Sequence, residues 1–410
     1  MIRIIKWFEK YLVVLLLLLL PTQLAYHFWP PWAFVFGIRV DMLSPAIYLT
    51  DILILALAVL NPGIFKIYKK YFLAILVFAI INCFFSISQP ESAYKWLKVF
   101  EFSFIALYFA KQKIVSLSSV VIVFFVSLVS ISLIGIAQFI KGGTIGGILY
   151  YLGERSFNQS TPGITLVSLS GVEHMRAYSI FSHPNSLAGF LGVSVLFILL
   201  SGKLKKNAVN FIGVLIILTC FILTFSISAY IGIFVVFSYY MFSKNKQSFF
   251  RVIIRSFILF VAGSILLPLL SPWIIQTFPL MESNIYQRLD LAYIAGQIIN
   301  QNFLIGEGLG TFIKSIPDYK GIFSYSWLLQ PVHNIFLLVF AETGIVGLLA
   351  FCYLIFKTLA GQLKTKKMYL LLPLILIIFT GLFDHYSLTL QQNILLFSVF
   401  IGLSFNGRIA

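Results

Sequence analysis

The chain consists mainly of long apolar stretches separated by short polar connections. An apolar run of about 20 residues is long enough to cross a bilayer as a helix, because a helix satisfies its backbone hydrogen bonds within the segment. The pattern predicts about twelve spans, at residues 11–28, 43–61, 71–88, 94–110, 119–140, 178–201, 208–225, 227–243, 251–270, 332–357, 368–385 and 388–405. We therefore expect an all-α polytopic membrane protein whose residues 1–410 form a single integral-membrane domain.

Composition and charge agree with this pattern. Hydrophobic residues make up 60% of the chain and charged residues 10%, with a mean hydropathy of +0.99, which excludes a soluble domain. Most of the 29 Lys and Arg residues fall in alternate connections, near residues 3–10, 66–70, 111–113, 203–206, 244–255, 357–367 and 408. Positively charged loops are retained in the cytoplasm, so both termini are predicted to be cytoplasmic. The net charge of +16 then reflects topology and attraction to anionic lipids, and it does not indicate a nucleic-acid surface.

With this orientation, the two longest connections, 141–177 and 271–331, lie on the outer side of the membrane. The second of them precedes the span that begins beside His333. The sequence contains no phosphate-binding glycine motif of the Walker or dinucleotide type, so we expect no nucleotide and no cofactor. The three cysteines fall inside apolar spans without metal-ligand spacing, which is typical of small buried side chains.

The outer side carries a small set of groups suited to a lipid-linked diphosphate. Arg176 precedes the sixth span, Arg288 lies in an amphipathic stretch of the large outer connection, and His333 closes that connection. Guanidinium groups offer forked donors to phosphate oxygens and stabilise the charge of a leaving diphosphate. A histidine can remove a proton from an attacking sugar hydroxyl near neutral pH. The combination describes glycosyl transfer without nucleotide or metal.

Each of these residues also has a purely structural interpretation. A single arginine at a helix end is usually an interfacial anchor. His183, followed by Pro184 and Asn185, marks the turn that starts a span. Asp384 and His385 occupy the last outer turn, from which they could reach an active site, although a surface turn is the default. Taken singly, none of them establishes a function.

A longer pattern links them. His333-Asn334, nine residues and then Gly344-x-x-Gly347 resembles the signature of the O-antigen ligases, bacterial membrane enzymes that move a finished glycan from undecaprenyl diphosphate to an acceptor. Segments around Arg176 and Arg288 resemble others in the wider superfamily of ligases and polymerases.

The resemblance implies a metal-independent, inverting transfer on the periplasmic or extracellular face of the bacterial cytoplasmic membrane. His333 would be the base, Arg288 and Arg176 would hold the diphosphate, and Asn334 would orient the imidazole or a sugar hydroxyl. The implied partners are a polyprenyl-diphosphate-linked glycan donor, membrane lipids and a glycolipid, glycan or protein acceptor.

Three functions remain open at this point. A ligase transfers a complete glycan to an acceptor, whereas a polymerase uses a second lipid-linked glycan as the acceptor. A lipid-glycan transporter would use the arginines only for binding and release. A translocation path should place polar residues along the spans, but the spans here are nearly all aliphatic and aromatic. The sequence therefore favours an enzyme.

Overall fold

The computed structural model describes residues 2–242, 282–319, 321 and 328–407. Three of the described helices are long and apolar enough to cross a membrane, namely Leu117–Lys141, Pro184–Ser201 and Ile335–Thr365, and five shorter helices are also apolar. The chain is a helical membrane protein, as predicted. The predicted span 251–270 and the first part of the large outer connection lie outside the described residues.

The helices follow the apolar pattern closely, with ends that shift by several residues. Their bounds are α1 (Ile2–Leu19), α2 (Leu49–Leu60), α3 (Gly63–Ile67), α4 (Lys69–Phe84), α5 (Gln89–Lys111), α6 (Leu117–Lys141), α7 (Pro184–Ser201), α8 (Ala208–Leu223), α9 (Ile227–Phe242), α11 (Glu282–Gln301), α12 (Phe312–Ser315), α13 (Ile335–Thr365), α14 (Met368–Thr380), α15 (Tyr386–Thr389) and α16 (Gln391–Phe405). α11 is the helix predicted around Arg288, and it carries that residue.

The connections contain short strands that the apolar pattern did not predict. Three antiparallel pairs form: β1 (Ala25–His27) with β4 (Ala46–Tyr48), β2 (Phe34–Val35) with β3 (Ile38–Arg39), and β5 (Leu166–Leu169) with β6 (Val172–Met175). The expectation of helix over 11–28 and 43–61 is therefore wrong at 25–27 and 46–48, where these residues pair with one another. Strands of three residues are too short to show the alternation that identifies a strand in a sequence.

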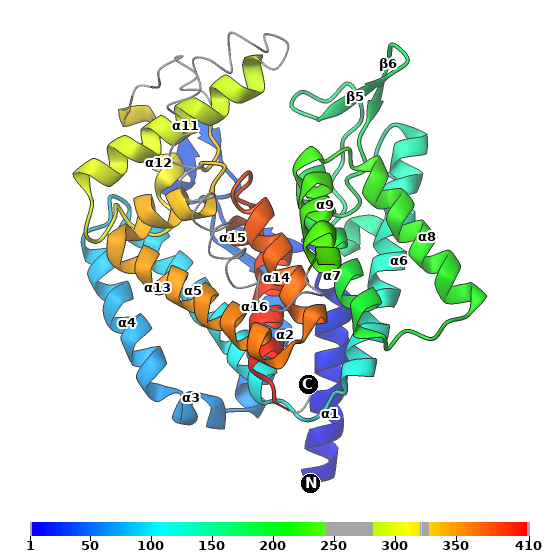
Figure 1. Cartoon of the computed structure of the whole chain (residues 1–410). Helices are drawn as coiled ribbons and strands as arrows, with labels where there is room; N and C mark the ends of the chain where they lie inside the picture. The colour runs from blue at the N-terminus through cyan, green and yellow to red at the C-terminus, as the bar shows by residue number, and fades with distance from the viewer. Residues whose placement is uncertain (1, 243–281, 320, 322–327, 408–410) are drawn as a thin grey trace.

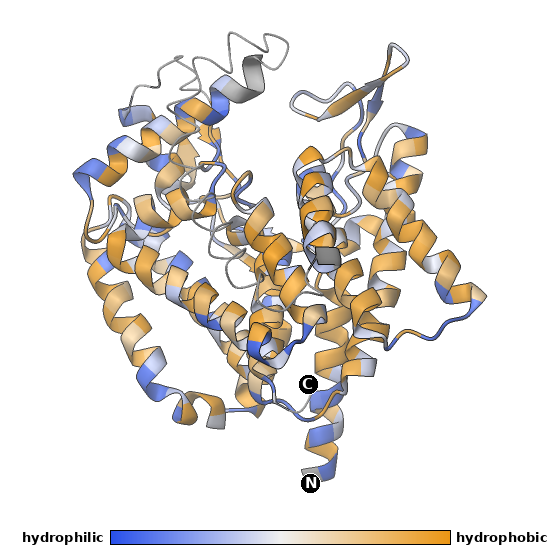
Figure 2. Cartoon of the chain, in the orientation of Figure 1, coloured by the Kyte–Doolittle hydropathy of each residue, from blue (hydrophilic) through white to orange (hydrophobic). Residues whose placement is uncertain are grey.

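The helices pack into one bundle with a second, smaller core at the end that the charge pattern predicts to be outer. α16 contacts α5, α14 contacts α7 and α9, and α6 contacts α8 (Figure 1). Apolar residues dominate these helices, while polar residues gather at helix ends and connections (Figure 2). The smaller core joins the β2–β3 hairpin to α11, α12 and the start of α13, with Ala33, Ile298 and Phe312 fully buried. It fixes the helix of Arg288 against the segment that carries His333.

α13 is interrupted in the middle of its apolar sequence. Gly344 adopts φ 65° and ψ −171°, a conformation that L side chains rarely adopt. A segment formed by residues 303–310, which we call the docked segment, bonds to the backbone groups around this break. Gly308 N donates to Glu342 O at 3.1 Å, and Ile345 N donates to Phe303 O at 2.8 Å. A Cβ atom at Gly344 would overlap the backbone of the docked segment.

Asn82 holds the break and the docked segment together. Its side chain is completely buried in α4 and donates to Ile305 O at 2.8 Å and to Glu342 O at 3.0 Å. Its Oδ1 accepts hydrogen bonds from Trp96 Nε1 at 2.8 Å and from Leu309 N at 3.0 Å. A break inside a membrane helix is tolerated where neighbouring groups replace the lost helical hydrogen bonds, as they do here.

Candidate active site

His333 lies immediately before α13, at the N-terminal end of the helix, which the charge pattern predicts to face the outer side and which we call its outer end. The next residue, Asn334, is the N-cap: its Oδ1 accepts from Phe336 N at 2.9 Å and from Leu337 N at 3.1 Å. Ile335 N donates to Gly381 O at 2.7 Å, which ties the start of α13 to the end of α14. A cap satisfies backbone donors that would otherwise lack partners and stabilises the helix start by about 1 kcal/mol. The Oδ1 of Asn334 is therefore engaged in the cap of α13, next to His333, a role that the sequence pattern did not predict.

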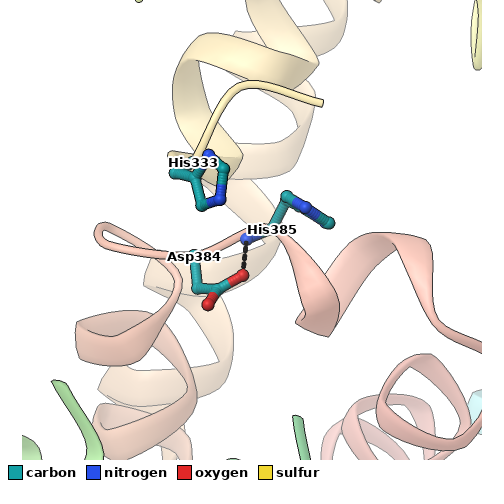
Figure 3. Close-up of side chains that lie close together, drawn as sticks. All are labelled: His333, Asp384 and His385. Carbon is teal, nitrogen blue, oxygen red and sulfur yellow. Dashed lines mark hydrogen bonds between the residues drawn. The ribbon is translucent and has the colours of Figure 1, made fainter. Parts of the chain in front are cut away.

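Asp384 and His385 face His333 from the turn between α14 and α15. The ring centroids of His333 and His385 are 5.2 Å apart, and Asp384 Oδ1 accepts from His385 N at 2.8 Å (Figure 3). One ligand atom from each of the three residues lies within 4.8 Å of the others. His385 Nδ1 is 2.7 Å from Thr389 Oγ1, one helical turn further along. Thr389 was not anticipated, although a hydroxyl four residues after a helical histidine is a detectable signal.

Arg176 reaches the same carboxylate through Asn185. Arg176 Nη2 donates to Asn185 Oδ1 at 2.8 Å, and Asn185 Nδ2 donates to Asp384 Oδ2 at 3.0 Å. The Nε of Arg176 donates to Thr224 O at 2.5 Å. His183 caps α7, because its Nδ1 accepts from Asn185 N at 3.1 Å. These contacts connect the segment that leads into α7 with the turn between α14 and α15, which are about 200 positions apart in the sequence.

Arg288 approaches the site from α11. Its side chain is exposed, and Nη1 donates to Phe383 O at 2.9 Å, on the residue before Asp384. An arginine has five N–H donors, so this contact leaves most of the guanidinium for an anion. The structure thus gathers every predicted site residue at one place: Arg176, His183, Asn185, Arg288, His333, Asn334, Asp384 and His385.

Burial sets the charge of the cluster. It lowers the pKa of His333 to about 3, against the opposing effect of Asp384, and lowers that of His183 to about 4. The pKa of His385 is also lowered by burial. Burial disfavours the charged form of Asp384. The pKa of this carboxyl nevertheless lies below its usual range, because of electrostatic interactions with His385, His333, His183 and Arg288. At neutral pH the site therefore combines a carboxylate, neutral imidazoles and guanidinium groups.

A neutral imidazole beside a carboxylate is suited to accept a proton. Among the described residues, none hydrogen-bonds to His333 Nδ1, which is buried. Asp384 can stabilise the imidazolium that forms when His333 takes up a proton. Two imidazoles and a carboxylate can also bind a cation, and each oxygen of Asp384 accepts one hydrogen bond from the protein.

A comparison with protein families adds an independent observation. Residues 212–352 match the family model described as O-Antigen ligase. The matched range includes Arg288, His333 and the break at Gly344, whereas Arg176 and Asp384 lie outside it. No curated protein matches the chain significantly.

Proposed function

We propose that the chain, whose residues 212–352 match the O-antigen ligase family model, transfers a glycan from a polyprenyl diphosphate carrier to an acceptor hydroxyl on the outer face of the membrane. The observation that carries this proposal is the neutral imidazole of His333, whose Nδ1 is buried, beside Asp384, with Arg288 bonded to the same turn. No nucleotide or metal is needed for the transfer we describe. The protein is multi-pass, and we place it in the bacterial cytoplasmic membrane.

In the proposed reaction, His333 acts as the general base. It removes the proton from the acceptor hydroxyl while the hydroxyl oxygen attacks the anomeric carbon of the donor sugar. The bond between that carbon and the diphosphate oxygen breaks, and the diphosphate leaves with the electron pair. Attack from the face opposite the leaving group inverts the anomeric configuration. Asp384 stabilises the protonated His333 in the transition state.

The two arginines have different places in this scheme. Arg288 is exposed and makes one hydrogen bond to a carbonyl, so its guanidinium can bind the diphosphate in a forked arrangement. Arg176 is half-buried and already donates to Thr224 O and Asn185 Oδ1. We assign Arg288 the main diphosphate contact. Arg176 contributes positive charge and holds the Asn185–Asp384 contact in place.

A resting pKa of about 3 for His333 is low for a base that works near neutral pH. Binding of a diphosphate close to His333 adds negative charge, which favours the imidazolium and raises the pKa of His333 in the complex. The free protein thus keeps the base neutral, and the donor increases its basicity when it binds.

Reconstitution tests the proposal directly. Purified protein is incubated with a polyprenyl-diphosphate-linked glycan, without nucleotide, in the presence and absence of a candidate acceptor, and the products are separated on a gel. A shift that requires the acceptor indicates a ligase, and a ladder from the donor alone indicates a polymerase. Binding of donor without any transfer, across glycolipid, glycan and protein acceptors, would contradict the enzyme and favour a transporter.

A further inference from the structure

A cavity of about 580 Å³ opens at the opposite end of the molecule, where α1 begins. Its walls come from the first turns of α1, the α2–α3 connection, the end of α5 and the α5–α6 connection. Pockets that bind small molecules have volumes of about 300–1,000 Å³, so the cavity is large enough for a ligand. The charge pattern of the sequence predicts that this end faces the cytoplasm.

Positive charge surrounds the cavity. Lys6, Lys10, Lys111 and Lys113 line it, and all four side chains are exposed. Among the described residues that line it, Glu9 is the single carboxylate. Glu9 is buried and accepts a hydrogen bond from Tyr108 Oη at 2.8 Å, so the four lysines outnumber a carboxylate that already has a partner. The lining therefore favours an anionic ligand.

An apolar stripe leads from the cavity along α1. Trp7 lines the cavity, and Tyr11, Leu15 and Leu18 follow at spacings of four, four and three residues on the same helical face. All four side chains are exposed, and the rings of Trp7 and Tyr11 lie 4.2 Å apart. A ligand with its charged part among the lysines would have this stripe available for hydrocarbon chains. The combination of cations and apolar surface fits an amphipathic anion.

We propose that this cavity binds the phosphate-bearing headgroup of an anionic membrane lipid, whose acyl chains lie along the stripe of α1. The ammonium groups of the four lysines would surround the phosphate, and Trp7 would pack at the level of the headgroup. Basic pockets between membrane helices on the cytoplasmic side bind lipids of this kind. The site is separate from the His333 cluster and does not depend on the transfer reaction.

The first test compares two sets of lysine substitutions in lipid binding. Purified protein is titrated with phosphatidylglycerol in mixed micelles, and bound lipid is counted by native mass spectrometry. The variant K6Q/K10Q/K111Q/K113Q should bind about 600-fold more weakly, since each neutralised lysine weakens binding by roughly fivefold. The matched variant K203Q/K205Q/K206Q removes exposed lysines of the α7–α8 connection and should bind as the unchanged protein does.

The two variants distinguish a specific binding site from general electrostatic attraction. Equal weakening in both variants, or no saturable binding at all, would overturn the site. Glycerol phosphate without acyl chains serves as the second ligand. If it binds as tightly as the lipid, with the same dependence on the four lysines, the phosphate comes from solution and the lipid assignment is overturned. Binding that requires the intact lipid supports it.

A second measurement leaves all the lysines in place. Phosphatidylglycerol carrying bromine atoms near the headgroup quenches tryptophan fluorescence on contact, and brominated phosphatidylcholine is the neutral control. We expect a saturable quenching component with the anionic lipid that Trp7→Phe removes. Quenching that is the same with both lipids, or that persists in Trp7→Phe, would contradict the proposal.

Discussion

The outer end of α13 and the break in its middle both contain polar groups in a mainly apolar protein. The two regions differ in how far these groups are hydrogen-bonded. At the break, the carbonyl of Glu342 and the amide of Ile345 are hydrogen-bonded to the docked segment, and Asn82 bonds to both sides. At the outer end, His333 Nδ1 has no partner among the described residues, and Arg288 is exposed. Buried polar groups with partners stabilise a structure, whereas buried groups without partners carry a cost that function can explain. The backbone groups at the break are paired, so we assign it a structural role, although Glu307 Oε1 in the docked segment also lacks a partner among the described residues. We propose a chemical role for the outer end because an imidazole, a carboxylate and an exposed guanidinium meet there.

Removal of the imidazole should give the largest effect. His333→Ala is expected to lower transfer by a factor of about 10²–10⁴, because a positioned general base contributes that much. The initial rate is measured with saturating donor and acceptor, and a thermal melt checks that the protein remains folded. His174→Ala is the control, because His174 lies on β6 and stacks on Phe139 outside the cluster. Undiminished transfer by His333→Ala would remove His333 from the role of base.

Arg288→Lys should have the next largest effect. An ammonium keeps the charge but cannot form the forked contact with a diphosphate, so we expect transfer to fall by about 10- to 100-fold, equivalent to one or two charge-assisted hydrogen bonds. Donor binding and the transfer rate are measured separately, because the arginine stabilises the leaving group as well as the bound donor. Arg155→Lys, at an ion pair with Asp41, provides a matched control. Normal transfer by Arg288→Lys would identify Arg288 as an interfacial anchor.

Substitution at the break should reduce stability more than chemistry. Gly344→Ala places a Cβ against the backbone of the docked segment at a positive φ, and we expect a loss of about 1–3 kcal/mol, seen as a lower melting temperature. Gly361→Ala is the matched control in the same helix, since its Cβ meets no atom within 4 Å. Equal melting temperatures for the two variants would contradict the structural role of the break.

Acidification should lower the stability of the folded protein, with a smaller effect than the substitutions above. The pKa of His333 is about 3 in the folded protein and about 6.5 in the unfolded chain, so the unfolded chain takes up a proton first as the pH falls. The stability of the folded protein should therefore be highest above pH 6.5 and should decrease as the pH falls toward the pKa of His333 in the folded protein. His183 contributes in the same direction. Melting temperatures between pH 7.5 and 4.5 should decrease less steeply in His333→Gln than in the unchanged protein, and parallel curves would contradict the assigned pKa.

The sequence predicted the membrane class, most helices and the members of the outer cluster because apolar length and residue chemistry are local properties. It did not predict how the cluster is assembled. The contact from Arg176 through Asn185 to Asp384 joins residues about 200 positions apart, and no spacing rule reveals such a contact. Gly344 interrupts its helix because a distant segment supplies the hydrogen bonds, and no local sequence pattern predicts that contact. Long-range pairing is the part of the fold that a single sequence leaves undetermined.

The smallest expected effect is that of a chelator, and it tests why His333 Nδ1 lacks a partner. If this nitrogen is the atom that accepts the proton of the acceptor hydroxyl, then EDTA or a stronger zinc chelator should leave the transfer rate unchanged. If the nitrogen is instead a metal ligand together with Asp384 and His385, chelation should abolish transfer, and added zinc should restore it. His385→Ala sharpens the comparison, because loss of a metal ligand would eliminate metal binding by the purified protein, whereas proton transfer by His333 would continue at a reduced rate. We expect unchanged transfer with chelator, since the proposed reaction uses the neutral imidazole of His333 as the base and the guanidinium of Arg288 on the diphosphate.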